Sequence, residues 1–209
     1  MEQLTAKTKR RYSPKVRRTM ILDSAAALIA EDGMSNLSME SIGQKADVSK
    51  TLMYKYFESL QELLRELLNR EISKRWRLQV VAAEKAETFE ELVRGTTQVY
   101  LHYVAERGLI IERLQSDTSI ISLHDRVHHY RKIAVDYFSD IVAKNFDMPL
   151  DLARATTEIS LGIPSSAGEF LLRSNMDLKE LEDLTVSMML GTYTMARLDH
   201  FTRKKKLKR

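Results

Sequence analysis

The residues with the clearest chemistry lie between positions 49 and 56, where hydroxyls, phenols and two lysines follow one another. Such side chains bind phosphate oxygens and base edges in the major groove of duplex DNA. Met53 and Phe57 stand four residues apart, so they share one helix face, which we expect to be buried. The other side chains of this run point away from that buried face. The candidate DNA contacts in this run are Ser49, Lys50, Thr51, Leu52, Tyr54, Lys55 and Tyr56.

Two of these contacts have alternative interpretations. Leu52 could touch a thymine methyl group or could simply be an exposed leucine. The ring of Tyr56 could cover the small core as readily as its hydroxyl could reach a phosphate. Tyr54 lies one step round the helix from the buried face, which favours a DNA contact over a role in the core.

Two short helices joined by a tight turn within residues 38–57 must position this run. Ser38 and Ser49 each stand at an N-cap position, and Ser38 is a further candidate for phosphate contact. Helices this short bury little alone, so their apolar residues must meet each other and a third helix. We expect that helix to start at Ser13-Pro14 and to end at Gly33. Arg17 and Arg18, near its start, could reach a phosphate or lie at the plain surface.

Residues 21–64 resemble the N-terminal helix-turn-helix of the TetR/AcrR family of bacterial transcription regulators. The resemblance rests on an Ala-rich helix ending at Gly33, the Ser-Met-Glu sequence at 38–40, and Val-Ser-Lys at 48–50 followed by Tyr-x-Tyr-Phe at 54–57. It implies an all-α fold in which this domain precedes a helical effector-binding and dimerisation domain. It also implies a homodimer, a double-stranded DNA operator and a small-molecule effector.

Three positions depart from the family pattern. Asp47 replaces the turn glycine, which is tolerable because Asp enters the left-handed region more readily than most residues. Gly43 stands where a small alanine usually packs between the two helices. Leu60 occupies a place where the family often has a phosphate-contacting lysine.

Charge is distributed unevenly along the chain. Residues 1–18 carry seven Lys/Arg against one Glu, and residues 203–209 carry six Lys/Arg and no acid. Because the two ends hold twelve excess cations and the whole chain is +4, residues 19–202 carry a net −8. An acidic body argues against nonspecific coating of DNA, whereas a basic arm beside the helix-turn-helix favours local phosphate attraction. The arm residues Lys9, Arg10 and Arg11 are candidate DNA contacts, with a solvated tail or a cloning remnant as the alternative.

Composition bounds the rest of the chain. Helix formers dominate, only three prolines and seven glycines occur among 209 residues, and cysteine is absent, which excludes disulfides and thiolate metal sites. No signal pattern and no apolar run near 18 residues occurs, so we expect a cytoplasmic protein that enters no membrane. We expect an all-α fold of about nine helices, with the arm and DNA-binding domain at 1–58 and the effector-binding and dimerisation domain at 59–209.

Helix signals divide the second domain. A capping box at Ser59–Glu62 predicts a long helix of about 25 residues, and Thr88–Glu91 predicts another that ends at Gly108. We expect a helix over residues 118–145, then one from Pro149 that breaks at Gly162–Pro164. Asp177–Glu180 predicts a last helix running to about residue 202.

The last helix is apolar almost all round over residues 186–196, so both its sides should be covered. We expect a partner subunit to provide one cover, with dimerisation through 149–172 and 178–202; an internal core helix is the alternative. The candidate dimer residues are Leu181, Met188, Gly191, Thr192 and Met195.

An effector pocket in this domain would lie between helices and be mostly apolar. Residues on inward stripes near the Gly162–Pro164 break could line it or could be ordinary core. His124 and His128 share a helix face and could meet a polar effector, whereas their spacing alone is a weak sign of metal. The candidate effector contacts are Tyr100, Tyr103, Leu114, His124, Val127, His128, Phe138 and Phe170.

Together with these patterns, the resemblance to the TetR/AcrR family implies a homodimeric, sequence-specific transcription regulator, a repressor released from a palindromic operator by a small, largely apolar effector. The alternatives are an activator and a module that acts through a protein or membrane partner, for example through the Arg203–Arg209 tail. An all-α metal-dependent enzyme is the least favoured, because no nucleophile, base and orienting group can be assembled. We therefore predict no catalytic residue, no metal and no cofactor.

Overall fold

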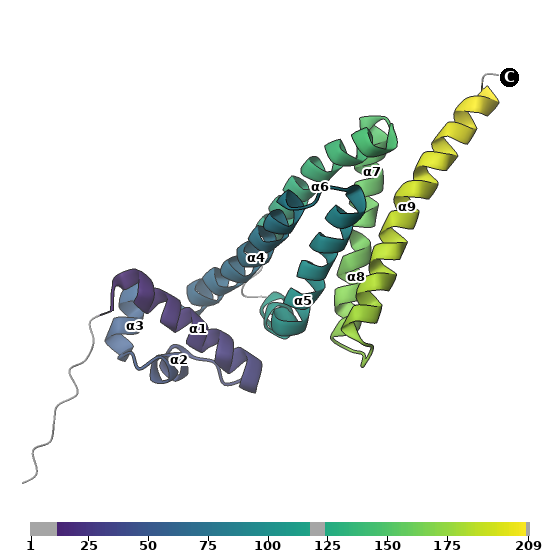
Figure 1. Cartoon of the computed structure of the whole chain (residues 1–209). Coiled ribbons are helices and arrows are strands. Elements are labelled where there is room, and N and C mark those ends of the chain that lie inside the picture. Colours follow the sequence, from purple (N-terminus) through teal and green to yellow (C-terminus); the bar gives the residue numbers. More distant parts are fainter. Residues whose placement is uncertain (1–11, 118–123, 208–209) are drawn as a thin grey trace, which may run out of the picture. The chain divides into compact units, whose positions relative to one another are not determined.

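The computed structural model describes residues 12–117 and 124–207, without the side chains of residues 124–128, 201 and 203–207. These residues form nine α-helices and no strand (Figure 1), as the composition predicted. They divide into two compact units, which we call the head (residues 12–67) and the body (68–117 and 124–207). The boundary at 58/59 expected from the sequence lies at the start of a helix whose first two turns still belong to the head.

The head consists of α1 (Pro14–Asp32), α2 (Met39–Lys45), α3 (Lys50–Tyr56) and the first part of α4 (Leu60–Glu84). As predicted, Pro14 opens α1 directly after the N-cap Ser13, and Gly33 ends it with φ of 78°. The Ser59 hydroxyl accepts a hydrogen bond from the Glu62 N–H at 3.1 Å and so caps α4. The core of the head is closed: its most deeply buried apolar side chains include Ile21, Ile29, Ile42, Met53, Phe57, Leu63 and Leu67.

The body contains the rest of α4 together with α5 (Phe89–Ser116), α6 (His124–Phe146), α7 (Leu150–Ser160), α8 (Gly162–Leu171) and α9 (Leu178–Leu207). The predicted capping box is present at Thr88 and Glu91. The Glu180 N–H donates to Asp177 Oδ1 at 3.0 Å at the start of α9. The break that was predicted at Gly162–Pro164 lies at Leu161, between α7 and α8, and Gly162–Pro164 are the first residues of α8.

Three helix boundaries in the body differ from the sequence-based expectation. The helix expected to end at Gly108 continues to Ser116. Gly108 serves close packing and is not a cap: a Cβ there would lie 3.0 Å from both Leu172 Cδ2 and Val104 Cγ1. The helix expected from residue 118 is described only from His124, since 118–123 lie outside the described residues, and α9 extends past residue 202 to Leu207. No helix in the described part of the chain is long and apolar enough to cross a membrane.

Candidate nucleic-acid interface and ligand pocket

Helix α3 buries one face and exposes the other. Met53 and Phe57 are 0% and 1% exposed, so the predicted inner face is confirmed, whereas Tyr54 is 49% exposed. Lys50, Thr51 and Lys55 are also exposed, and Leu52 and Tyr56 are half-buried. The hydroxyl, phenol and ammonium groups of this short helix therefore face outward together.

The two lysines of α3 keep their charges unpaired. Neither Lys50 nor Lys55 makes an ion pair with any residue that the structure describes, whereas Lys45 on α2 pairs with Glu31. An unpaired ammonium on an exposed helix is available to a phosphate or to a guanine edge. Lys45 is thus engaged in an ion pair within the head, whereas Lys50 and Lys55 are accessible to a binding partner.

The turn before α3 depends on two of the positions that depart from the family pattern. Asp47 adopts φ of 51°, the left-handed conformation expected of the residue that replaces glycine. A Cβ on Gly43 would lie 3.0 Å from the Val48 carbonyl oxygen and 3.1 Å from Met53 Cγ. Glycine at 43 therefore lets α2 approach the turn and α3 closely, and an alanine there would require these neighbours to shift by a few tenths of an ångström. The third position, Leu60, lies half-buried at the first residue of α4.

The two predicted N-cap serines occupy their positions. Ser38 Oγ accepts a hydrogen bond from the Ser41 N–H at 3.0 Å, and Ser41 Oγ accepts one from the Ser38 N–H at 3.0 Å. Ser49 Oγ accepts from the Leu52 N–H at 3.4 Å. Both serines are exposed, so their capping role leaves the hydroxyls accessible. The arm residues Lys9, Arg10 and Arg11 lie outside the described residues.

Arg18 joins three elements of the head, which the sequence did not reveal. Its Nε donates to Glu66 Oε1 at 2.7 Å, its Nη1 donates to the Tyr56 carbonyl at 2.7 Å, and its guanidinium carbon lies 4.3 Å from the centroid of the Phe57 ring. The hydrogen bond to Glu66 raises the pKa of Arg18. Arg18 therefore fixes the C-terminus of α3 to α1 and α4 and is occupied within the head. No local pattern announces this, because Tyr56 and Glu66 lie 38 and 48 residues further along the chain.

The candidate effector residues whose side chains the structure describes do not converge on one site. Tyr103 is bonded to a buried carboxylate, Leu114 is fully buried core, and Phe138 lines a narrow cavity of about 20 Å³. Phe170 is 47% exposed on an open apolar surface formed by α7, α8 and α9. Of the candidates whose side chains the structure describes, only Tyr100 lines a large pocket with both charged and apolar walls. The side chains of His124, Val127 and His128 lie outside the described residues.

That pocket lies among α4, α5 and α8 and has a volume of about 500 Å³, within the range of small-molecule sites. Its wall combines apolar and charged side chains. From the sequence, a mostly apolar wall was expected. Except for Tyr100, the residues of the pocket were not predicted from the sequence, because they come from three helices separated in the chain. Its main walls include Arg75 on α4, Tyr100, Gly108 and Ile111 on α5, Gly168 on α8, and Leu172 at the C-cap of α8.

A buried carboxylate network lies on the same two helices, α4 and α5. Glu71 is 1% exposed and accepts from the Tyr103 hydroxyl at 2.8 Å and from two guanidinium nitrogens of Arg107, each at 3.0 Å. Burial acts to raise the pKa of Glu71, but the hydrogen bonds from Arg107 and Tyr103 outweigh it and the pKa is lowered. Burial and the bond to Glu71 raise the pKa of Tyr103. The carboxylate is therefore ionised and fully engaged.

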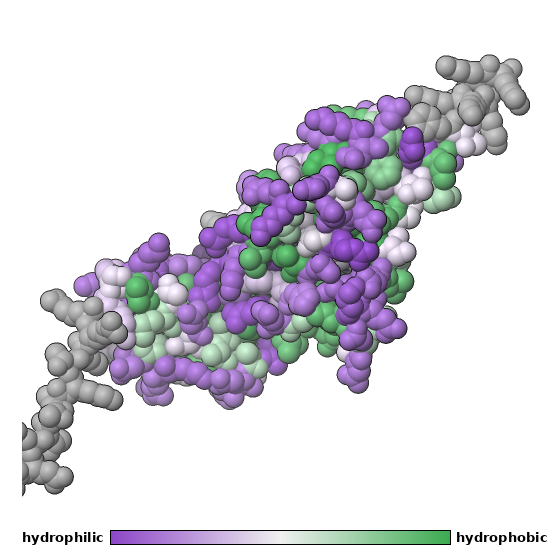
Figure 2. All heavy atoms as spheres, in the orientation of Figure 1, coloured by the Kyte–Doolittle hydropathy of each residue, from purple (hydrophilic) through white to green (hydrophobic). Residues whose placement is uncertain are grey.

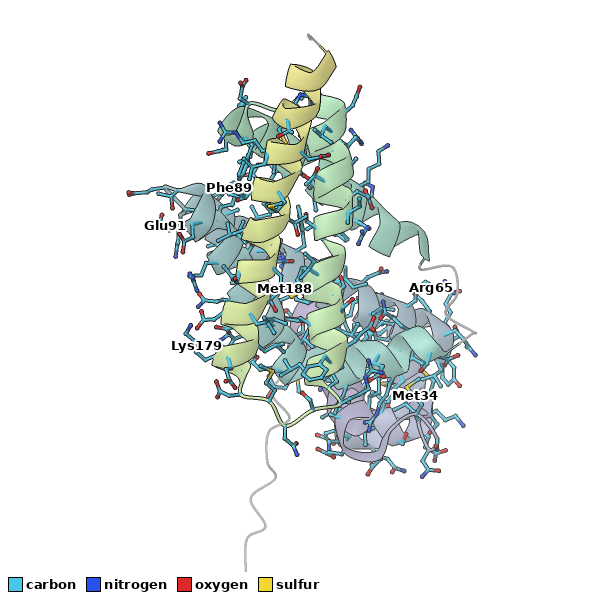
Figure 3. All side chains as sticks on the ribbon, turned by 90° about the vertical axis from the view of Figure 1, so that its right-hand side faces the viewer. Met34, Arg65, Phe89, Glu91, Lys179 and Met188 are labelled. Carbon is cyan, nitrogen blue, oxygen red and sulfur yellow. The ribbon has the colours of Figure 1, made fainter. Side chains whose placement is uncertain are left out.

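An apolar face remains uncovered on α7, α8 and α9. Ile159 is 71% exposed, Met188 53% and Met195 64%, and a groove of about 520 Å³ runs between these helices. Figure 3 shows α9 beside α7 and α8 with Met188 on this face, and Figure 2 shows apolar residues in green among the polar ones on the surface of the body. Of the other candidate dimer residues, Leu181 lines the groove although it is buried, Gly191 is exposed, and Thr192 is half-buried with its hydroxyl donating to the Met188 carbonyl at 2.8 Å.

Among the described residues, no group of three His, Asp or Glu side chains could hold a metal ion. The described residues thus form three candidate binding features: the exposed polar face of α3, the pocket among α4, α5 and α8, and the open apolar face of α7–α9.

Comparison with known proteins gives a family match for the head and a shared fold for most of the chain. Residues 21–67 match the family described as bacterial regulatory proteins, tetR family. No curated protein matches the sequence. Among solved structures, a TetR-like transcriptional regulator from Rhodococcus sp. RHA1 is 18% identical, with 86% of this chain and 97% of that one covered and a TM-score of 0.69.

Two other solved structures share the fold at a similarly low sequence identity. A protein named provisionally as a transcriptional regulator from Pseudomonas aeruginosa PAO1 is 15% identical over 90% of this chain and 96% of that one, with a TM-score of 0.75. The fatty acid degradation regulator FadR from Bacillus halodurans is 15% identical over 87% and 97%, with a TM-score of 0.67. The family is one of transcription factors and not of enzymes. The head of this protein therefore matches the tetR family of bacterial regulatory proteins, and most of the chain has the fold of TetR-like transcriptional regulators.

Proposed function

We propose that the protein is a homodimeric repressor that binds a palindromic operator through α3 and leaves it when a small molecule binds the body. We assign DNA binding to residues 1–58 and effector binding and dimerisation to residues 59–209. The observation that carries the proposal is the outer face of α3, where Tyr54 is half exposed and the unpaired Lys50 and Lys55 are accessible. Its inner face is fully used by the core of the head, so the outer face is free for bases and phosphates.

The open face of α7–α9 supports the homodimer. Exposed Ile159, Met188 and Met195 would lose their contact with water if the same face of a second copy covered them. A symmetric pair places two α3 helices on one duplex, and their separation must be near one helical turn, about 34 Å, or a multiple of it. The operator of such a dimer is an inverted repeat.

The pocket among α4, α5 and α8 is our choice for the effector site. One of its walls is Arg75 on α4, and α4 is a continuous helix from Leu60, in the head, to Glu84. A ligand that shifts α4 therefore acts on the element that carries the head. The groove on α7–α9 is assigned to the partner subunit, because it lies on the open apolar face.

Selection of bound sequences from random duplexes tests the proposal, followed by footprinting of the enriched site. We expect an inverted repeat protected over both half-sites and a protein mass of two chains in solution. Enrichment of no sequence, or a monomer that binds a single half-site as tightly as the full repeat, would contradict it. Linkage adds a second requirement: an effector that weakens operator binding must itself be bound more weakly, by the same factor, in the presence of operator.

A further inference from the structure

We infer that the pocket among α4, α5 and α8 selects an amphipathic carboxylate, a molecule whose apolar chain or ring system ends in a carboxylate group. This inference rests on the proposed function, which assigns the effector to this pocket, and specifies the chemistry of the ligand. The residues that carry it are Arg75, Tyr100 and Gly168.

Arg75 supplies the positive charge inside the pocket. Its guanidinium carbon lies 5.0 Å from the centroid of the Tyr100 ring, and the residue is half-buried. Among the residues that the structure describes, Arg75 makes no ion pair and no hydrogen bond, and the Tyr100 hydroxyl has no partner either. A partly buried cation without a counterion loses hydrogen bonds to water, and the Tyr100 ring face does not replace these hydrogen bonds. An anion at this place would restore that loss.

The stacked arrangement suits a carboxylate. Stacking on an aromatic ring occupies the face of a guanidinium and leaves its N–H edge available. A carboxylate binds such an edge with two parallel hydrogen bonds. The Tyr100 hydroxyl, on the same ring, is a further donor that lines the pocket.

Gly168 leaves space for the ring of Tyr100. A Cβ at this position would lie 3.1 Å from Tyr100 Cε1 and 3.3 Å from its hydroxyl oxygen. The absence of a side chain lets Tyr100 lie against the backbone of α8, where Arg75 can stack on it. Arg75, Tyr100 and Gly168 thus form one structural unit drawn from three helices.

The acidic residues of the pocket do not reverse its preference. Glu112 and Glu169 are exposed, so water and salt screen their charges, and exposed Arg173 lies beside them and donates to the Glu169 carbonyl at 3.1 Å. The half-buried charge of Arg75 is screened less. A ligand with a cationic head would meet this charge without a counterion, and a neutral ligand would leave it unpaired. The apolar part of the ligand has Val104, Ile111 and Leu172 to contact.

Three probes of equal chain length test the inference: decanoate, decan-1-ol and decylammonium, each titrated calorimetrically into the full-length protein below its aggregation concentration. We expect decanoate to bind at least about tenfold more tightly than the alcohol, the ratio that a charge-assisted hydrogen bond provides, and the ammonium to bind weakest. Arg75→Met should abolish the preference for decanoate while binding of the alcohol is kept, and Arg75→Lys should restore part of it. Arg77→Met, an arginine of the same helix outside the pocket, is the matched control and should change nothing.

Equal binding of the alcohol or the ammonium, binding of none of the three, or an undiminished decanoate preference in Arg75→Met would overturn the inference. Melting temperatures of the variants exclude unfolding as the cause, and Arg75→Gln provides a second neutral variant. Operator binding without any probe, measured on the same samples, keeps the two proposals apart. If decanoate binds through Arg75 and no operator is found, the proposed function fails; if the operator is bound and the head group is irrelevant, only this inference fails.

Discussion

The head and the body place apolar and polar residues in opposite ways. In the head, the core closes on itself around Ile42, Met53 and Phe57, and the exposed residues of α3 are polar or amphipathic. In the body, ionisable groups such as Glu71 are buried, while Ile159 and Met188 are exposed. A closed core with a polar exterior suits a unit that meets a polyanion. An open apolar face suits a unit whose surface is completed by another copy.

The difference between the two regions separates two kinds of variant. Changes on the outside of the head should alter DNA binding without affecting stability or assembly. Changes on the open face or in the buried network of the body should alter assembly or stability first, and DNA binding only as a consequence. If the two regions responded alike to substitution, the distinction would fail.

The largest effect is expected from Met188→Asp on the open face. A symmetric interface would contain this substitution twice, and an uncompensated buried charge costs about 3 kcal/mol. The dimer should be weakened by about 6 kcal/mol, roughly four orders of magnitude in its dissociation constant. Sedimentation equilibrium measures it, with Leu78→Asp, at a 43% exposed leucine of α4, as the control that should stay dimeric. A dimeric Met188→Asp variant would remove this face from the interface.

Loss of the Glu71 carboxylate should destabilise the body. Glu71→Ala removes the buried acceptor of the hydrogen bonds from Arg107 and the Tyr103 hydroxyl, which we expect to cost about 3 kcal/mol of unfolding free energy, measured by urea denaturation. Glu106→Ala, at an exposed glutamate of α5, is the control and should stay within about 0.5 kcal/mol. A loss no larger than that of the control would show that the network adds little.

The lowered pKa of Glu71 predicts that the unfolding free energy depends on pH. The pKa of Glu71 is lower in the folded protein than in the unfolded chain, because the bonds from Arg107 and Tyr103 outweigh burial. The stabilisation is then complete above the unfolded-state pKa and is lost as the pH falls through the lower, folded-state pKa. The difference in unfolding free energy between the wild-type protein and Glu71→Gln should be constant near neutral pH and should shrink in acid. A difference that grows on acidification would contradict the assignment.

The head was predictable from sequence because its signals are local. N-cap serines, the four-residue spacing of Met53 and Phe57, and the tolerance of Asp47 for positive φ all act within a few residues. The body was less predictable, because a local rule met a long-range contact: Gly108 resembled a helix end, but it is where Leu172 packs against α5. Contacts such as Arg75 on Tyr100 join helices whose relation no spacing encodes. Stripes of apolar residues indicate which side of a helix is inward, but not which cavity that side meets.

Removal of a single α3 contact should weaken operator binding by about ten- to hundredfold. Tyr54→Ala and Lys55→Ala each delete one exposed group, and a good contact to a base or phosphate contributes about 1–3 kcal/mol. Both variants should stay dimeric with unfolding free energies within about 0.5 kcal/mol of the wild type. Fluorescence anisotropy at several salt concentrations measures the loss, with Lys144→Ala in the body as the charge-matched control. Unchanged operator affinity would show that α3 does not contact DNA.

The smallest effects come from a pair of helix glycines, and they test the open face most finely. Replacing an interior helix glycine by alanine gains about 1 kcal/mol in helix propensity. At Gly108 the new methyl group would meet Val104 and Leu172, so overpacking should cancel or exceed this gain. At Gly191 nothing lies within 4 Å of the place that a Cβ would occupy, so in the monomeric Met188→Asp background the alanine should stabilise α9. In the wild-type background the sign should reverse, because close approach of a second α9 at Gly191 leaves no room for the methyl group. Unfolding measured in both backgrounds therefore reports whether this surface is free or covered, and stabilisation in both would place Gly191 outside the subunit contact.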